Sequence, residues 1–279
     1  MGTMTDVLRR ATAYLERHGV DSPRATAEIL LMHVLGTDRT GIYGRTEGLD
    51  TAQARRFGRA LCQRCTGIPL QHLTGEQTFR RVRLRVRPGV FIPRPETEVL
   101  VEHALAAIAD VERPVVVDVG TGTGAIALAI ADERRDAHVI GIDVSLDAVA
   151  LARENAAAAG LEVAIHDGDL LDAVPDGLRG RVDLVVSNPP YVAADALEDL
   201  PDEVRADPEL ALVGGLPVYA RLADAAASVV RPGGSVAVEV GETQARDVAG
   251  VLRDAGWTAV AIEQDLNGRD RVIVASRVP

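Results

Sequence analysis

The sequence predicts an α/β protein. A mostly parallel, doubly wound sheet with an antiparallel final strand follows a small all-helical amino-terminal domain. Three observations predict this fold. Apolar residues recur at helical spacing in the first 75 residues. After Arg113, short apolar runs alternate with helical segments, as in a parallel sheet. The last two predicted strands flank Asn267-Gly268, which is typical of an antiparallel pair.

The length of the chain indicates more than one domain. At 279 residues it exceeds a typical single domain. Apolar residues make up 47% of the chain and aromatic residues 3%, so the core must be aliphatic. We predict a helical substrate-recognition domain over 1–75, a β-hairpin linker over 76–95 and a catalytic domain over 96–279.

The predicted helical domain has clear helix boundaries. Apolar residues follow helical spacing over 5–17. The pair Ser22-Pro23 predicts an N-cap and a first helical position, and Gly36 predicts the end of that helix. A further helix is expected over 50–66. No catalytic residues gather here, so the domain is expected either to recognise a partner or simply to pack its own core.

The next segment, from Gly75 to Gly89, mixes apolar residues with arginines. The alternation predicts a hairpin with arginines on its solvent face, either merely solvated or docking an acidic or RNA-bound partner. Two alternate prolines then make Phe91–Glu98 a rigid lead into a helix that carries Glu96 and Glu98 in its first turn. The arginines are Arg80, Arg81, Arg83, Arg85 and Arg87.

The α/β part contains alternating strands and helices. Strands are expected at 115–117, 138–142, 162–165, 182–187 and 236–240, and an antiparallel pair at 258–263 and 271–275. The helices between them are expected at 124–134, 145–159, about 218–230 and 243–255, with Ser145 as an N-cap and Pro232-Gly233-Gly234 as a turn.

A glycine-rich loop follows the first of these strands and opens a helix. Its glycines allow positive φ and close ligand approach, and the helix presents free N–H groups. Asp143 ends the next strand, about 20 residues later, where a carboxylate can accept two ribose hydroxyls. The same spacing, with Ala125 as the third small residue, also fits a dinucleotide. The predicted loop residues are Asp118, Gly120, Thr121, Gly122, Thr123 and Gly124.

Three features favour S-adenosyl-L-methionine over a dinucleotide. Asp118 suits the ammonium group of a methionine moiety better than a pyrophosphate. Asp169 and Leu170 follow the third strand, where an adenine amino group would need an acceptor. The sheet also ends in an antiparallel pair, whereas a dinucleotide fold would continue with parallel units. We therefore predict a methyltransferase that yields S-adenosyl-L-homocysteine, with a dehydrogenase as the alternative.

The strand at 182–187 ends in Asn188-Pro189-Pro190-Tyr191, because two prolines cannot donate to a ladder. The result is a stiff loop with one side-chain amide, unpaired carbonyls and an aromatic ring. The Asn188 oxygen and a neighbouring carbonyl can together accept both hydrogens of a planar NH2 group, and Tyr191 can stack on it. An ordinary proline-rich turn would show the same residues, but the glycine loop favours the catalytic interpretation.

Taken together, these motifs resemble the peptide chain release factor glutamine methyltransferases. The resemblance covers nearly the whole chain and rests on the glycine loop, Asp143, Asn188–Tyr191 and above all Phe91–Glu98. It implies a Rossmann-like class I methyltransferase sheet and transfer to the glutamine amide of the Gly-Gly-Gln motif of class I release factors. The turn at 214–217 departs from the family pattern and is expected to touch no site residue.

The resemblance also implies residue roles. Gly120–Gly124, Asp143, Asp169 and Leu170 would hold the cofactor. Asn188 and the Pro189 carbonyl would grip the amide, with Phe91, Pro190 and Tyr191 at its slot. Orientation of the nitrogen by these contacts would replace a general base, and no metal is expected.

The net charge of the chain limits the classes of partner that it can bind. Acidic residues number 41 against 30 basic ones, for a formal net charge of −11, and the chain has no lysine. This excludes a P-loop or a Schiff base and argues against duplex binding through phosphates. An amino-group methyltransferase acting on adenine or cytosine is the first alternative, and a silent cofactor-binding module is the second.

The remaining sequence signals are weak. Cys62 and Cys65 lack a second pair of metal ligands, so they are expected to be two thiols on a helix. No apolar run is long enough to span a bilayer, and the first ten residues are too charged for a secretory signal. We expect a cytoplasmic protein that does not bind membranes.

Overall fold

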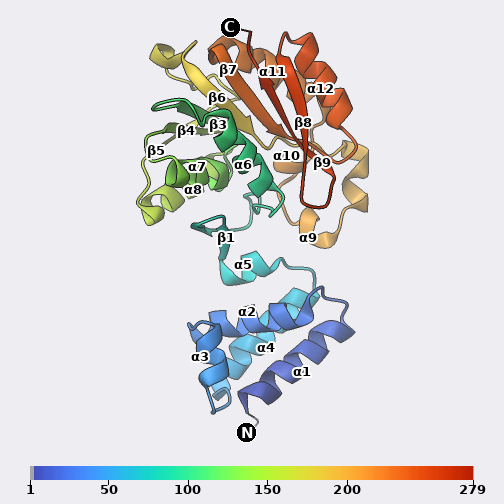
Figure 1. The fold of residues 1–279 in the computed structure, drawn as a ribbon. Helices are drawn as coiled ribbons and strands as arrows, with labels where there is room; N and C mark the ends of the chain where they lie inside the picture. Colours follow the sequence, from blue (N-terminus) through green and yellow to red (C-terminus); the bar gives the residue numbers. More distant parts are fainter. Residues whose placement is uncertain (1–2, 279) are drawn as a thin grey trace. The chain divides into compact units, whose positions relative to one another are not determined.

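The computed structural model of the chain describes residues 3–278, and these form two compact units (Figure 1). One unit runs to Glu76 and includes 201–206. The other comprises 77–200 and the residues from Asp207 onward. A short stretch after the Asn188 loop is thus part of the helical unit although it lies far from it in the sequence.

The helical unit is built on helices that bury aliphatic side chains. Arg64 is almost fully buried on α4 and forms an ion pair with Glu203 of α9, which attaches that short helix. The helices are α1 (Met4–Arg17), α2 (Pro23–Leu35), α3 (Arg39–Gly44), α4 (Thr51–Cys65), α5 (Leu70–Thr74) and α9 (Asp202–Arg205). Their core includes Leu8, Leu15, Leu30, Leu31, Val34, Ile42, Phe57 and Leu61.

The start of α2 lies at the predicted residues, but the predicted capping interaction is not formed. Ser22 occupies the N-cap position of α2, but its φ is +46° and its side chain makes no capping hydrogen bond. An N-cap residue normally has extended geometry, which aims its oxygen at the free amides of the first turn. Ser22 thus occupies the predicted N-cap position without capping the helix through its side chain, and Pro23 is the first helical residue, as predicted. Gly36 does end it, in the left-handed conformation.

The second unit contains a seven-stranded sheet with the order β5-β4-β3-β6-β7-β9-β8. Strands β5, β4, β3, β6 and β7 are parallel, and β9 runs antiparallel to both β7 and β8. The predicted fold class is confirmed. The bounds are β3 (Val115–Val119), β4 (His138–Asp143), β5 (Val163–Asp167), β6 (Val182–Ser187), β7 (Val230–Glu239), β8 (Thr258–Gln264) and β9 (Asp270–Ser276).

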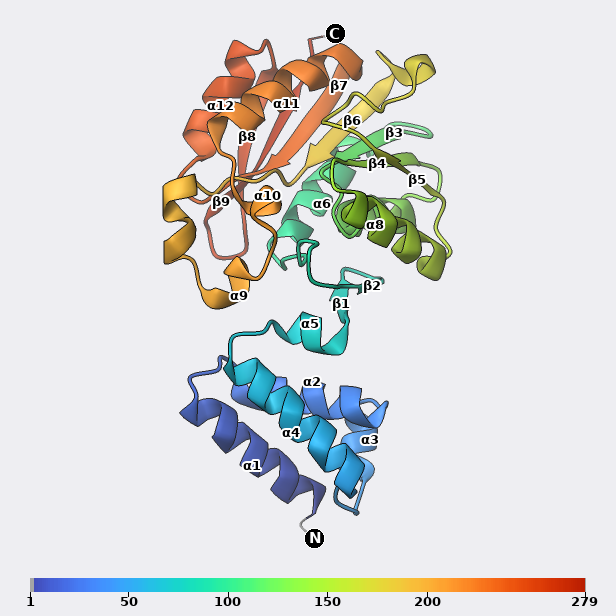
Figure 2. The ribbon, with the colours of Figure 1, turned by 180° about the vertical axis from the view of Figure 1, so that it is seen from behind.

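Helices cover both faces of this sheet (Figures 1 and 2). Alternate strand residues face opposite sides, so Val116 and Leu184 pack with α6 and α7, while Val117 and Val185 pack with α11 and α12. The helices are α6 (Thr97–Ala107), α7 (Ala125–Glu133), α8 (Leu146–Ala159), α11 (Leu216–Val229) and α12 (Ala245–Asp254), with shorter turns η1 (Asp176–Leu178), η2 (Ala194–Asp199) and α10 (Glu209–Leu212).

The predicted turn at Pro232-Gly233-Gly234 is wrong, because these residues lie inside β7. The pairing between β6 and β7 is irregular there, stepping from Val182 opposite Val230 to Leu184 opposite Ser235. Proline has no N–H to donate to a strand ladder. It is tolerated at such a bulge because the ladder is interrupted there. A side chain at Gly234 would meet the Asp183 carbonyl at 2.9 Å.

The predicted hairpin of β1 (Glu76–Phe79) and β2 (Val82–Arg85) is present, and in β2 Arg83 and Arg85 are exposed as predicted. Two other arginines, Arg80 and Arg87, bind neighbouring helices. Arg80 is largely buried and binds the Glu133 carboxylate of α7 through both Nε and Nη2. The Arg80 backbone also donates to Glu98 Oε1 at 2.9 Å. Arg87 pairs with Glu154 of α8 at 3.1 Å. These arginines fasten the hairpin to the helices beside the sheet.

Candidate active site

The candidate site lies where neighbouring parallel strands end. The loop after β3 runs from Gly120 to Gly124 into α7. Gly120 and Gly122 have φ of +71° and +57°, and a Cβ on Gly120 would meet nothing within 4 Å. Residues with side chains rarely adopt this conformation, so glycine is needed for the backbone geometry while the space beside Gly120 stays open.

Asp118 binds this loop and the start of α7 through hydrogen bonds. It is fully buried, and its Oδ2 accepts from the Thr121 hydroxyl at 2.6 Å and from the Ala127 amide at 3.1 Å. Burial raises the pKa of Asp118 to about 7. Its Oδ1 is buried with no hydrogen-bond partner among residues 3–278. Asp118 therefore shapes the loop, and its contact with a cofactor ammonium group stays a prediction.

Asp143 at the end of β4 is joined to the same loop. Its Oδ2 accepts from the Gly122 amide at 2.8 Å and its Oδ1 from the Ser145 amide at 2.9 Å. Burial raises the pKa of this carboxyl. Ser145 also caps α8 through its side chain, as predicted. The two elements predicted to share a cofactor are thus adjacent and hydrogen-bonded.

The loop after β5 lies beside Asp143, because the Gly168 amide donates to the Asp143 carbonyl at 3.1 Å. Asp169 is exposed and pairs with Arg221 at 2.6 Å. Leu170 has a φ of +51°, in the left-handed region that bulky residues avoid. Such strained residues cluster at ligand sites, which agrees with the predicted role of this loop but does not test it.

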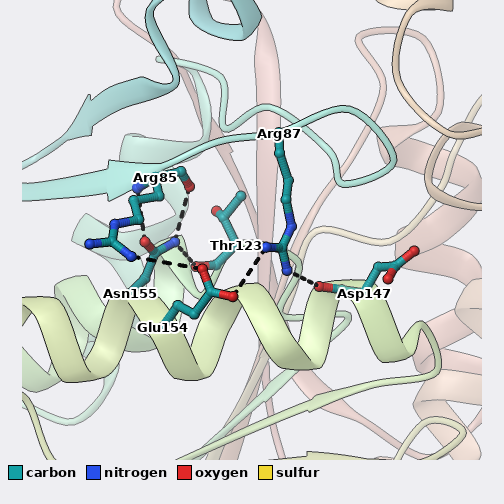
Figure 3. Close-up of polar contacts among 6 residues, drawn as sticks. All are labelled: Arg85, Arg87, Thr123, Asp147, Glu154 and Asn155. Carbon is teal, nitrogen blue, oxygen red and sulfur yellow. Dashed lines mark hydrogen bonds and ion pairs between the residues drawn. The ribbon is translucent and has the colours of Figure 1, made fainter.

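Sequence reasoning missed Asn155, which joins the glycine loop to the hairpin. This residue of α8 is fully buried and points toward both segments (Figure 3). Its Nδ2 donates to the Thr123 carbonyl at 2.9 Å and to the Arg85 carbonyl at 3.1 Å. Its Oδ1 accepts from the Arg85 amide at 2.8 Å. An asparagine inside an alanine-rich helix was the available signal.

Replacing Asn155 with alanine is expected to destabilise the protein by about 1–3 kcal/mol for each buried backbone group left unpaired. The buried group is the Thr123 carbonyl, and two part-buried groups, the amide and carbonyl of Arg85, also lose their partner. Urea unfolding measures the loss. Asn267→Ala is the matched control, because Asn267 is exposed and uses its backbone amide to bind Asp265. Equal stability of the two variants would show that Asn155 does not stabilise the junction between the glycine loop and the hairpin.

The loop Asn188–Tyr191 follows β6, beside the glycine loop. The Ser187 hydroxyl donates to the Val119 carbonyl at 2.7 Å, which ties the ends of β6 and β3 together. Asn188 Nδ2 donates to the Thr97 hydroxyl at 3.2 Å. Gln244 Nε2 donates to the Tyr191 carbonyl at 3.0 Å. The rigid lead and the proline loop, predicted separately, therefore meet through Thr97 and Asn188.

The backbone next to Phe91 is bound by a buried carboxylate, that of Asp207. Asp207 accepts from the Ile92 amide at 3.0 Å and pairs with Arg94. The Arg94 guanidinium lies over the Phe91 ring, 5.2 Å from its centre. Burial raises the pKa of Tyr191, and Arg94 is among the charges that oppose this shift. Arg94 thus lies over Phe91, and its charge also acts on the Tyr191 hydroxyl.

The turn at 214–217 does touch the predicted site, so that expectation is wrong. The Gly215 amide donates to the Pro190 carbonyl at 3.1 Å, and the Gly214 amide donates to the Val192 carbonyl at 3.0 Å. A Cβ on Gly214 would lie 2.1 Å from the Pro190 oxygen. Absence of a side chain at Gly214 is what allows the turn to support the loop.

Two negative findings apply to residues 3–278. No group of three or more histidine, cysteine, aspartate or glutamate side chains there could hold a metal ion. No helix in this part of the chain combines the length and apolar character needed to cross a bilayer. Cys62 and Cys65 are free thiols on α4.

Comparison with known proteins decides the family. A family model described as the PrmC N-terminal domain matches residues 6–75, and one described as the methyltransferase small domain matches 81–203. The release factor glutamine methyltransferase of Deinococcus radiodurans is 43% identical over 98% of both chains. The chain belongs to the release factor glutamine methyltransferase family. The corresponding protein of Mycolicibacterium smegmatis is 42% identical over 100% of this chain and 99% of its own.

Membership of the release factor glutamine methyltransferase family confirms the resemblance inferred from the motifs and makes this chain a methyltransferase. Solved structures agree on the fold alone. The ribosomal protein L11 methylase of Lactobacillus delbrueckii has a TM-score of 0.51 at 24% identity, covering 70% of this chain and 86% of its own. The Thermus thermophilus 16S rRNA N2 G1207 methyltransferase, solved with AdoMet and guanosine, has a TM-score of 0.53 at 21% identity, covering 72% and 49%.

Proposed function

We propose that this chain transfers the methyl group of S-adenosyl-L-methionine to the side-chain amide nitrogen of a glutamine in class I peptide chain release factors. The observation that carries the proposal is the arrangement at the strand ends. A glycine loop bound to Asp143 lies next to Asn188, and the Ser187–Val119 hydrogen bond links the two strands. Family membership supplies the substrate, because the relatives are named for it.

The residues present fit the proposed cofactor. The open space beside Gly120 would admit a ligand against the backbone, and the nine-residue helix α7 begins at the loop. Asp143 would accept the ribose hydroxyls, and Asp169 with Leu170 would lie at the adenine. When bound, S-adenosyl-L-methionine supplies a methyl group on a positively charged sulfur. Its product would be S-adenosyl-L-homocysteine.

The chemistry asked of the protein is orientation of a poor nucleophile. The lone pair of an amide nitrogen is delocalised into its carbonyl, so the nitrogen must be held in the right direction. The Asn188 oxygen and the Pro189 carbonyl would accept its two hydrogens, with Phe91 and Tyr191 beside the amide plane. Positioning of this kind can contribute about 7–11 kcal/mol in favourable cases.

We further propose that the helical unit contacts the release factor and that the enzyme acts in the cytoplasm, with translation. The match of 6–75 to the PrmC N-terminal domain supports a family-specific role for these helices. A truncated enzyme lacking residues 1–76 would be expected to keep cofactor affinity and to lose affinity for the release factor.

Radiolabelled S-adenosyl-L-methionine, offered with purified release factor or with DNA and RNA, tests the function. The proposal expects label in the release factor and none in nucleic acid. Label in nucleic acid alone would instead indicate an amino-group methyltransferase of bases, and cofactor binding without turnover on either would indicate a silent module.

Replacing Asp143 with alanine is expected to weaken cofactor binding. Loss of a charged hydrogen-bond partner costs about 1.5–3 kcal/mol, which is about 10- to 150-fold in Kd. Calorimetry with S-adenosyl-L-methionine measures the change. The exposed Asp110→Ala serves as control because it alters the net charge equally. An unchanged Kd for Asp143→Ala would remove Asp143 from the cofactor site.

A further inference from the structure

Glu239 is a buried carboxylate at the edge of the candidate site. It ends β7, and Ser187 pairs with Val238 in the neighbouring β6, so Glu239 lies level with Asn188. It is 1% exposed, and its Oε2 has no hydrogen-bond partner within the described part of the chain. Burying an ionised carboxylate is costly unless it is paired or hydrogen-bonded, because burial removes its hydration.

Two neighbours of this carboxylate come from the two signature segments. Burial raises the pKa of Glu239, and hydrogen bonding from Thr97 and from Asn188 opposes this shift, which is the action of donors on a carboxylate. Asn188 Nδ2 in turn donates to the Thr97 hydroxyl. Asn188 and Thr97 are therefore hydrogen-bonded to each other, and both lie close enough to the Glu239 carboxylate to act on its pKa.

The direction of hydrogen bonding among Glu239, Thr97 and Asn188 follows from their chemistry. An ionised carboxylate only accepts, so the single Thr97 hydroxyl proton goes to Glu239. The Thr97 oxygen then accepts, and what it accepts must be the NH2 side of Asn188. An amide whose nitrogen is held in this way presents its oxygen, Oδ1, to the opposite side.

We propose that Glu239 is a positioning residue that, through Thr97, fixes the side-chain amide of Asn188 with Oδ1 available to accept from the target NH2 group. This inference rests on the proposed function, since only an amino-group substrate needs an acceptor there. We call this chain of hydrogen bonds, from Asn188 through Thr97 to Glu239, the relay. If its direction were reversed, the Asn188 NH2 group would face the substrate NH2 group, and two donors cannot pair.

The relay should depend on pH. Burial raises the pKa of Glu239 to about 7, so the carboxyl gains a proton as the pH falls through that value. A protonated carboxyl can donate to Thr97 and no longer sets the direction. The charged and titratable groups facing it are Glu96, Tyr191, Tyr219 and Arg271. Among them Arg271 favours the ionised carboxyl and Glu96 opposes it.

Nuclear magnetic resonance can observe the relay directly, because the chain contains only three asparagines, Asn155, Asn188 and Asn267. Protein labelled with 15N-asparagine gives three side-chain NH2 signals, and the spectrum of Asn188→Ala assigns one of them. In the wild type we expect the Asn188 signal to move with a midpoint near pH 7, while the signals of Asn155 and Asn267 do not follow it.

Three variants decide the question. Glu239→Gln removes the titrating group and supplies a competing donor, and Thr97→Val removes the hydroxyl at nearly constant volume. Both should abolish the pH-dependent movement of the Asn188 signal, whereas Thr97→Ser should keep it. Persistence of the movement in Glu239→Gln, or its absence from the wild type between about pH 5.5 and about pH 8.5, would overturn the relay.

Activity gives an independent readout. Glu239→Gln and Thr97→Val should lower kcat by about 10²-fold with little change in KM for the release factor, and Thr97→Ser should restore most of it. At about pH 8 the melting temperature of Glu239→Gln should not fall, because ionised Glu239 is then destabilising. Wild-type kcat in Glu239→Gln would overturn the inference. A wild-type enzyme inactive on release factor would instead refute the proposed function, and the resonance test would still decide the relay.

Discussion

Replacing Asn188 with alanine is expected to lower kcat for methyl transfer by about 10²- to 10³-fold, with cofactor affinity and melting temperature nearly unchanged. The reason is that Asn188 supplies one preorganised polar contact to the reacting nitrogen. In the folded protein it contacts Thr97 and lies outside the hydrophobic core. Single-turnover transfer, calorimetry and thermal unfolding on one variant separate these effects.

A purely structural Asn188 would give the opposite pattern. If it merely ended β6, the alanine variant would melt at a lower temperature and turn over normally. Asn267→Ala, in the turn between β8 and β9, is the control for loss of an asparagine away from the site. Full activity in a destabilised Asn188→Ala would mean that the loop is only a strand terminus.

Replacing Gly214 with alanine is expected to disable the enzyme although the residue is outside every motif. The new Cβ would lie 2.1 Å from the Pro190 oxygen, closer than real Cβ contacts allow. The obstacle is backbone, so either the Asn188–Tyr191 loop or the turn must shift. A displacement of about 1 Å at a reacting centre can cost about 10²-fold in rate.

Gly250→Ala is the matched control for this steric effect. Gly250 lies in α12, and a Cβ there meets nothing within 4 Å. Alanine should stabilise that helix by about 0.5–1 kcal/mol and leave turnover unchanged. Turnover and cofactor affinity are measured for both variants. A fully active Gly214→Ala would show that the 214–217 turn does not position the loop.

The sequence predicted features that depend on local patterns. The run at 182–187 and the two prolines after it gave the bounds of β6, and Ser145 gave the start of α8. Local patterns gave wrong predictions where contacts with distant segments determine the structure. The Pro232-Gly233-Gly234 stretch fits both a turn and a bulge, and only its pairing with β6 distinguishes them.

The supporting residues of the site were not predictable for the same reason. Glu239 looks like the polar end of any strand until the register places it beside Asn188. Asn155 and Gly214 act on segments far away in the chain, at Arg85 and Pro190. Motif spacing therefore predicted the side chains expected to contact ligands. The residues that support those side chains depend on the packing of distant elements, which the spacing does not reveal.

Peptide mapping by mass spectrometry tests the central claim most directly. Purified release factor is incubated with the enzyme and S-adenosyl-L-methionine, digested and sequenced by fragmentation. We predict one added methyl group, on the side-chain amide of the glutamine in the Gly-Gly-Gln motif, and none with Asn188→Ala over the same time. A methyl group on another residue type, or an unmodified release factor in the presence of active cofactor turnover, would contradict this account.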